Sequence, residues 1–242
     1  MWDPFVVVLG TMAALGAFLW FRRRDLNYFF IGKLGSTGKS TILLLTAHPD
    51  DEVMFFAPTI LALREAGFKV RLVCFSTGDF DGLGKTRVKE LSACAKNLGI
   101  MQECLDKPDM FPDDSSRIWK RELVATEIQS LVRKYAPDIL MTFDNYGVSG
   151  HLNHRSLYHG LIFYLKSRTD TPKSYALRSV SLLRKFTSYL DIFVSYIPVL
   201  YNVICGHSND GRLVFISSFS GLRHSQSVST SSFDNVSSFP RR

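Results

Sequence analysis

The chain has 242 residues, of which 46% are hydrophobic, and this length and composition are typical of one domain with a full core. Its formal net charge of +7 indicates anionic surfaces as partners, without choosing between lipid headgroups and nucleic acid. No arginine-rich run interleaved with aromatic residues occurs, so we expect no nucleic-acid partner.

The N-terminus carries an apolar segment. Phe5–Phe21 is seventeen residues long without a charge, and Arg22, Arg23 and Arg24 follow it directly. This length is near the lower limit for a membrane-spanning helix. A signal peptide would carry its positive charge before the apolar run, whereas here the order is reversed. We therefore predict one N-terminal transmembrane helix within residues 1–24, with the rest of the chain on the cytoplasmic side. A buried core helix is the alternative.

Residues 25–40 are predicted to form a glycine-containing linker. The sequence GSTGKS at its end resembles part of a phosphate-binding P-loop, but Lys33 stands where the full motif needs glycine. In a P-loop the motif also follows a strand and opens a helix, whereas here it precedes the strand. We therefore expect no nucleotide ligand.

Strand-like and helix-like segments alternate from Thr41 onward. Strands are predicted at Ile42–Leu45, Lys69–Ser76, Asp138–Phe143 and Leu177–Leu182, and helices at Val53–Ala66, Thr86–Leu98, Arg117–Tyr135 and His154–Lys166. Strands separated by helices of this length indicate βαβ units. The pattern predicts an α/β fold, a Rossmann-like parallel sheet with helices on both faces.

A cluster of polar residues follows the first of these strands. The strand ends at His48 and Pro49, and Asp50, Asp51 and Glu52 come next. His48, Asp50 and Asp51 are expected at the carboxyl end of the strand, where open α/β sheets bind ligands. Imidazole and carboxylate suit Zn²⁺ and similar ions, and a carboxylate that does not bind the metal can accept a proton from its water. The alternative is a helix cap that only satisfies backbone amides.

A second cluster follows the strand at 138–143. Residues 144–154 are DNYGVSGHLNH, so His151 and His154 stand three positions apart after a glycine-containing turn. Residues with this spacing share a helix face, which lets both imidazoles reach one small site. A single histidine is more often a surface or core residue. Two histidines at the same sheet edge as His48 favour a metal site.

These segments resemble a known family. AHPDDE at 47–52, TRVKE at 86–90 and SGHLNH at 149–154 closely resemble motifs of the LmbE-like metal-dependent de-N-acetylases. Within that family, MFFAPT at 54–59 and TFDNYGVSGHLNH at 142–154 are most similar to the branch that acts on N-acetylglucosaminyl-phosphatidylinositol. The combination of AHPDDE with GHxNH at this separation is highly specific.

The resemblance implies a role for each residue of the two clusters. His48, Asp51 and His154 would bind a divalent metal ion, in the first place Zn²⁺, although Fe²⁺, Mn²⁺ and Co²⁺ accept the same ligands. Asp50 would be the general base that takes a proton from water and passes it to the departing amine. His151 would stabilise the oxyanion in its charged form.

Two further residues are implied to bind the substrate. Arg87 occupies the position at which the family uses an arginine, and a guanidinium suits a phosphate or sugar hydroxyls. Asp144, directly after a strand, would be the second. The alternative for Arg87 is a solvated helix face.

The implied function is hydrolysis of the acetamide of N-acetylglucosaminyl-phosphatidylinositol, an early step in building glycosylphosphatidylinositol anchors. The implied partners are this glycolipid and the cytoplasmic face of the endoplasmic reticulum membrane. Four cysteines without CxxC spacing fit a reducing compartment. The alternatives are a de-N-acetylase of a soluble amino sugar and a non-catalytic, membrane-tethered isoform.

The C-terminal part departs from the family. Residues 205–242 are rich in serine and predict a disordered tail, which leaves 41–204 as the de-N-acetylase domain. Before the tail, Phe186–Ile204 is strongly apolar. It fits the core, a lid over the site, or a segment in the membrane interface.

Overall fold

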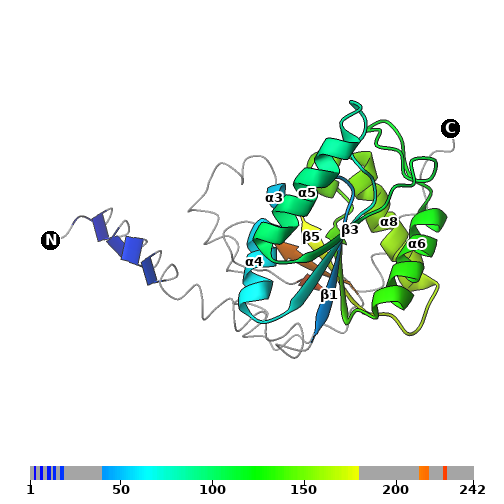
Figure 1. The fold of residues 1–242 in the computed structure, drawn as a ribbon. Coiled ribbons are helices and arrows are strands. Elements are labelled where there is room, and N and C mark those ends of the chain that lie inside the picture. Colours follow the sequence, from blue (N-terminus) through cyan, green and yellow to red (C-terminus); the bar gives the residue numbers. More distant parts are fainter. Residues whose placement is uncertain are drawn as a thin grey trace.

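A parallel sheet flanked by helices forms the body of the protein (Figure 1). The computed structural model describes residues 40–179, single positions between 3 and 18, and the strands at 213–217 and 226–227. The strands are β1 (Thr41–Thr46), β2 (Lys69–Cys74), β3 (Met101–Cys104), β4 (Ile139–Phe143), β5 (Lys173–Arg178), β6 (Leu213–Ser217) and β7 (Gln226–Ser227). The helices are α3 (Asp51–Met54), α4 (Ala57–Glu65), α5 (Gly84–Leu98), α6 (Arg121–Tyr135), α7 (Gly147–Gly150) and α8 (Leu152–Lys166).

The strand order places β1 near the middle of the sheet. In the described part of the chain the order is β3-β2-β1-β4-β5-β6-β7, with parallel pairing from β3 to β6 and antiparallel pairing of β6 with β7. The predicted α/β fold with a parallel sheet is thereby confirmed. Because the chain moves outward from β1 to β3 and then resumes at β4, the direction of winding switches between β1 and β4. Doubly wound sheets bind ligands at such a switch, at the carboxyl ends of the strands.

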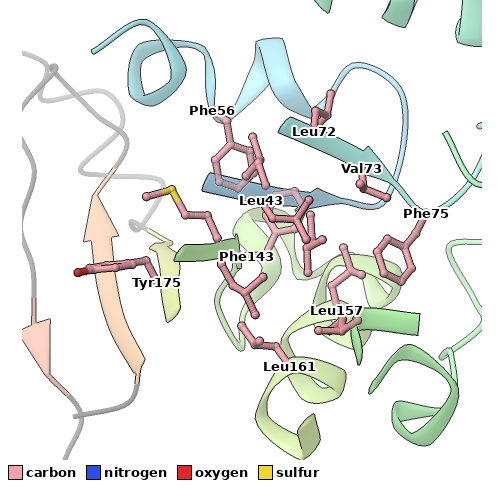
Figure 2. Packing of buried hydrophobic residues seen from close by; sticks show 14 of the residues in the cluster. Leu43, Phe56, Leu72, Val73, Phe75, Phe143, Leu157, Leu161 and Tyr175 are labelled. Carbon is pink, nitrogen blue, oxygen red and sulfur yellow. The ribbon is translucent and has the colours of Figure 1, made fainter. Parts of the chain in front are cut away.

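Helices cover both faces of the sheet. On one face α4 packs against β2 and α5 against β3, and on the other α6 and α8 pack together while α8 contacts β1 and β4 (Figure 1). Residues 42–45 of β1 are consequently buried. Figure 2 shows Phe56 on one side of β1 and Leu157 and Leu161 on the other.

The helix predicted at Val53–Ala66 is two helices in the structure, α3 and α4. Pro58 lies in the first turn of α4. A proline inside one continuous helix would lose a backbone hydrogen bond and clash with the carbonyl four residues earlier, so the chain restarts at Ala57. The prediction of its end was correct, because Gly67 follows with φ of 86°.

Tertiary packing moves the start of another helix. The helix predicted from Arg117 begins at Arg121. Trp119 is buried against Phe75 and Phe111, and its Nε1 donates to the Pro112 carbonyl at 2.9 Å. This packing holds residues before 121 outside the helix.

Two strands differ from the prediction. β3 was not predicted, because its sequence MQEC is short. In the structure this segment is only partly buried, and it forms a strand by pairing with β2. The strand expected at Leu177–Leu182 is β5, which begins at Lys173 and pairs with β4. Tyr175 and Ala176 are buried in it.

Several predicted segments lie outside the described residues. These are nearly all of the predicted anchor at 1–24, nearly all of the linker at 25–40, and all of Phe186–Ile204, so these stay predictions. Among the described residues, no helix combines the length and apolar character needed to cross a bilayer.

The expectation of a disordered tail at 205–242 differs from the structure at two stretches. β6 pairs with β5 in parallel, and β7 pairs with β6. The sequence LVFIS of β6 favours a strand although its surroundings are rich in serine.

Candidate functional site

A cavity of about 310 Å³ opens at the carboxyl ends of β1 and β4, where the winding switches. It contains every predicted site residue except Asp144. Its lining consists of His48, Asp50, Asp51, Met54, Phe55, Phe80, Arg87, Asp113, Ser115, Ser149, His151 and His154. The structure thus brings together two clusters that lie about a hundred residues apart in the sequence.

The Asp51 side chain bonds to the backbone at the end of β1. Its Oδ2 accepts hydrogen bonds from the backbone amides of Ala47 and His48, both at 2.9 Å. Its Oδ1 lies 3.1 Å from Nε2 of His154. Burial raises the pKa of Asp51, but the two neighbouring imidazoles, His154 and His48, together with the backbone amide of His48, outweigh burial and lower the pKa. Asp51 is therefore a buried carboxylate aimed at an imidazole.

The orientation of His154 leaves one ring nitrogen available. Nδ1 lies 3.1 Å from the Gly147 carbonyl, which fixes the proton on Nδ1 and a lone pair on Nε2. Nε2 is buried, faces Asp51 Oδ1, and has no hydrogen-bond partner of acceptable geometry. An imidazole lone pair and a carboxylate oxygen repel each other unless a cation lies between them. The buried Nε2 of His154 is therefore suited to bind a metal ion.

Asp113 orients His48 in a similar way. His48 Nε2 lies 3.1 Å from Asp113 Oδ1, which leaves Nδ1 as the lone-pair nitrogen on the side of Asp51 Oδ2, at 3.9 Å. The hydrogen bond from His48 is the main cause that lowers the pKa of Asp113. The Asn153 side chain fits best with its oxygen 3.1 Å from His48 Nε2 and its nitrogen donating to the Arg117 carbonyl at 2.9 Å.

His151 completes a group of three imidazoles. His48, His151 and His154 each offer a ring nitrogen within 4.8 Å of the others, so the cluster can bind a metal ion. His151 Nδ1 accepts from the Asn153 amide at 3.3 Å, which places the proton on Nε2 and makes that nitrogen a donor rather than a ligand.

The protonation of His151 differs from the expectation of a charged form. Burial, followed by the neighbouring imidazoles of His48 and His154, lowers its pKa to about 4. A neutral imidazole is therefore favoured at pH 7. It can still donate a hydrogen bond from Nε2.

Asp50 is held in an unusual backbone conformation. Its φ is 109°, a value that a residue with a side chain rarely adopts, and its amide donates to Glu52 Oε2 at 3.1 Å. Burial and the charge of Asp51 raise the pKa of Asp50, against the opposing effect of Arg87.

Arg87 on α5 is occupied largely by the chain itself. Its Nη2 donates to the Pro49 carbonyl at 2.7 Å and to Asp50 Oδ2 at 3.0 Å, while Nη1 donates to the Gly78 carbonyl at 3.0 Å. Arg87 therefore lines the cavity, but its contacts position the turn after β1, and its expected contact with the substrate stays a prediction.

Asp144 does not reach the cavity. Its Oδ1 accepts from the amide of Gly147 at 2.9 Å and from Ser179 Oγ at 2.6 Å, and its Oδ2 accepts from the Ser179 amide at 2.5 Å. Both oxygens are thus used to join the turn after β4 to the end of β5. In the structure donors of the chain itself occupy the carboxylate, and the expected substrate contact of Asp144 stays a prediction.

The sequence-based reasoning missed Asp113 and Asn153. Asp113 follows β3, and because this strand was not predicted, nothing placed the sequence PDD at the same edge as His48. Asn153 stands between the two predicted histidines, so its presence in HLNH was the available signal.

The fold and the site together define a class of protein. A doubly wound parallel sheet carries histidines and carboxylates at its winding switch, in a cavity that can bind a metal ion. Among solved structures, N,N'-diacetylchitobiose deacetylase from Pyrococcus horikoshii is similar in fold, with a TM-score of 0.51 and 17% sequence identity over 77% of this chain and 84% of that chain.

The sequence comparisons give the family. The family PIG-L, described as GlcNAc-PI de-N-acetylase, matches residues 43–164. The N-acetylglucosaminyl-phosphatidylinositol de-N-acetylase of Arthroderma benhamiae is 38% identical over 67% of this chain and 62% of its own length. The Bos taurus protein of the same name is 40% identical over 64% of this chain and 63% of its own length, and the probable one of Dictyostelium discoideum 33% identical over 64% and 71%. The chain belongs to the PIG-L family, and it spans about two thirds of the length of these relatives.

Proposed function

We propose that the chain is a metal-dependent de-N-acetylase of N-acetylglucosaminyl-phosphatidylinositol, which releases acetate and leaves the free amine. One observation carries the proposal: Asp50, a carboxylate of raised pKa, lies in the same cavity as the ligand set His48, Asp51 and His154. Relatives that carry this name support the choice of substrate.

The donor set fits a divalent metal ion. His48 through Nδ1, His154 through Nε2 and Asp51 through Oδ1 would hold the ion, and two imidazoles with one carboxylate suit Zn²⁺. A bound divalent ion lowers the pKa of a water and polarises a carbonyl. Asp113 and the Gly147 carbonyl fix the tautomers that both imidazoles need for this.

The remaining residues move the proton and stabilise charge. Asp50 accepts the proton of the attacking water and passes it to the amine nitrogen as the C–N bond of the acetamide breaks. Arg87 holds the carboxylate of Asp50 in place. Neutral His151 donates a hydrogen bond from Nε2 to the carbonyl oxygen as negative charge develops there.

The substrate and its location are part of the proposal. A second cavity of about 170 Å³ adjoins the first at Asp113, which leaves room beyond the acetamide for a larger headgroup. The apolar Phe5–Phe21 followed by Arg22–Arg24 supports a membrane anchor, with the catalytic domain on the cytoplasmic face of the endoplasmic reticulum.

The direct test measures acetate released from N-acetylglucosaminyl-phosphatidylinositol by the purified full chain, before and after chelation and after readdition of Zn²⁺. We expect metal-dependent release that is lost in Asp50→Asn. Release from free N-acetylglucosamine, but not from the glycolipid, would identify the chain as a soluble amino-sugar de-N-acetylase instead.

The absence of any metal-dependent release, with an active relative measured alongside, would contradict an enzymatic role. It would favour a non-catalytic, membrane-tethered protein. In that case, replacing residues 205–242 with the corresponding segment of the active relative should restore activity.

A further inference from the structure

The exposed hydrophobic residues are unevenly distributed over the described domain. Eight large hydrophobic side chains between residues 40 and 179 are exposed. Six of them follow the carboxyl ends of β1 to β4, and we call these the apolar rim: Val53, Met54, Phe80, Leu83, Ile118 and Tyr146. The other two, Leu61 and Met101, lie within α4 and at the start of β3. Because the four strands are parallel, the segments that carry the rim begin at one edge of the sheet.

Two residues of the apolar rim lie at the cavity. Met54 and Phe80 belong to the rim and also line the cavity, although they are 65% and 69% exposed. Phe80 and Leu83 lie in the loop that leads to α5, and Ile118 in the loop that leads to α6. A substrate in the cavity therefore lies beside the exposed side chains of Met54 and Phe80.

We propose that the apolar rim docks on a lipid bilayer, so that the cavity opens directly onto the membrane surface. This inference rests on the proposed function, because acyl chains that stay in the bilayer keep the headgroup at its surface. Single scattered hydrophobic residues need no explanation, but a cluster at one edge indicates an interaction site. Exposed aromatic and aliphatic side chains of this kind can enter the headgroup region of a bilayer.

The charged residues beside the rim indicate whether docking depends on electrostatic attraction or on apolar insertion. Asp81 and Lys85 flank Leu83, while Asp109, Arg117 and Lys120 lie in the loop of Ile118, and all five are exposed. Both signs are therefore present at the rim. Docking is driven by apolar insertion, and it depends only weakly on salt.

The first experiment measures which positions enter the bilayer. The full chain is reconstituted in vesicles of phosphatidylcholine and phosphatidylinositol, with an environment-sensitive fluorescent amino acid at position 83 or 118. Positions 61 and 101, exposed but outside the rim, are the matched controls. We expect lipids brominated on the acyl chains to quench the fluorophore at 83 and 118, but not at 61 and 101, at both low and high salt.

Three outcomes would overturn the inference. These are equal quenching at all four positions, no quenching at 83 and 118, and quenching that disappears at high salt. Protection of positions 83 and 118 from iodide without vesicles would show that residues 180–242 or a second copy of the chain cover the rim. That result would also contradict bilayer docking.

A second measurement separates this inference from the proposed function. In Leu83→Asp combined with Ile118→Asp, deacetylation of the glycolipid in vesicles should fall by about tenfold, the factor that corresponds to burying about one large apolar side chain. Deacetylation of the water-soluble headgroup, without acyl chains, should be unchanged, which also shows that the variant folds. Equal loss on both substrates would contradict docking. If the unaltered chain hydrolyses neither substrate, the proposed function fails, while the quenching still decides the docking.

Discussion

Neighbouring carboxylates at the end of β1 have opposite environments. Asp51 is buried, with its Oδ2 bonded to two backbone amides and its Oδ1 aimed at His154. The side chain of Asp50 is 53% exposed and is held by Arg87. The left-handed backbone of Asp50 turns the two side chains apart. Identical side chains can therefore serve as ligand and base.

This difference predicts that Asp50 and Asp51 are not interchangeable. Asp51→Asn should lower metal occupancy, because an amide is a poorer ligand than a carboxylate. Asp50→Asn should keep the metal but lower turnover by about 10²–10⁴-fold, the range for a lost general base. Elemental analysis and acetate release on the same samples measure both. Equal loss of metal in the two variants would refute the assigned roles.

Asp113 should act on the metal site through His48. Asp113→Asn weakens the hydrogen bond that fixes the His48 tautomer, so we expect metal affinity to fall by about 10–100-fold, as for other residues that orient a ligand. A competition titration with a chelating indicator measures the affinity. Asp114→Asn is the matched control, because the Asp114 side chain bonds Ser116 and pairs with Arg117. Equal effects of the two substitutions would exclude a specific role for Asp113.

At the scale of elements, α5 supports the turn after β1. Arg87 in its first turns joins the carbonyls of Pro49 and Gly78 to the carboxylate of Asp50. Glu52 accepts from the Asp50 amide, which holds that turn from the other side. A helix that lies far along the chain from His48 thereby fixes the position of Asp50.

Arg87→Met should lower kcat more than it raises KM. Hydrogen bonds to charged groups contribute about 1.5–3 kcal/mol, so the loss is expected to be about 10–100-fold in kcat. Steady-state kinetics separates the two constants. Arg64→Met is the control, since Arg64 donates to the Leu98 carbonyl and also joins two helices. A rise in KM with kcat unchanged would instead indicate that Arg87 binds the substrate, as expected from the sequence.

The turn that forms α7 depends on Gly147. This residue has φ of 68°, and a Cβ on it would lie 2.9 Å from the Cβ of His154. Gly147→Ala should therefore cost more than the roughly 1–2 kcal/mol of a left-handed residue, and it should also displace His154. Gly150→Ala is the control, since Gly150 has φ of 82° with no atom within 4 Å of its Cβ. Thermal unfolding and metal occupancy measure both effects, and similar losses in the two variants would contradict this account.

At the scale of the whole molecule, the proposed anchor sets the topology. An arginine near the centre of a bilayer costs about 2.5–3.5 kcal/mol on insertion scales, so Leu15→Arg should impair membrane insertion. Protease added to sealed microsomes should digest the domain that carries His48 and His154, and Asn235 should carry no glycan. A protected domain or a glycosylated Asn235 would place the site in the lumen. Release of the protein by alkaline carbonate would show that Phe5–Phe21 does not span the bilayer.

Local sequence was sufficient for the parts of the fold that local interactions control. The apolar run of β1, the glycine after α4 and the glycine after α5 marked real boundaries. Their physical basis is short-range, since a buried strand needs apolar residues and a positive φ favours glycine. The two polar clusters could also be placed at one edge, because parallel strands share their carboxyl ends.

Contacts between segments that are distant in the sequence determined the features that local sequence did not predict. β3 became a strand by pairing with β2, and only then does Asp113 reach His48. The carboxylate of Asp144 accepts hydrogen bonds from Ser179, the residue directly after β5, and no local sequence pattern indicates this contact. The low pKa of His151 likewise arises from burial and from two other imidazoles. The tertiary structure alone determines which residues are buried, which donors bond a carboxylate, and which form of a histidine is favoured. All three depend on which segments of the chain pack together.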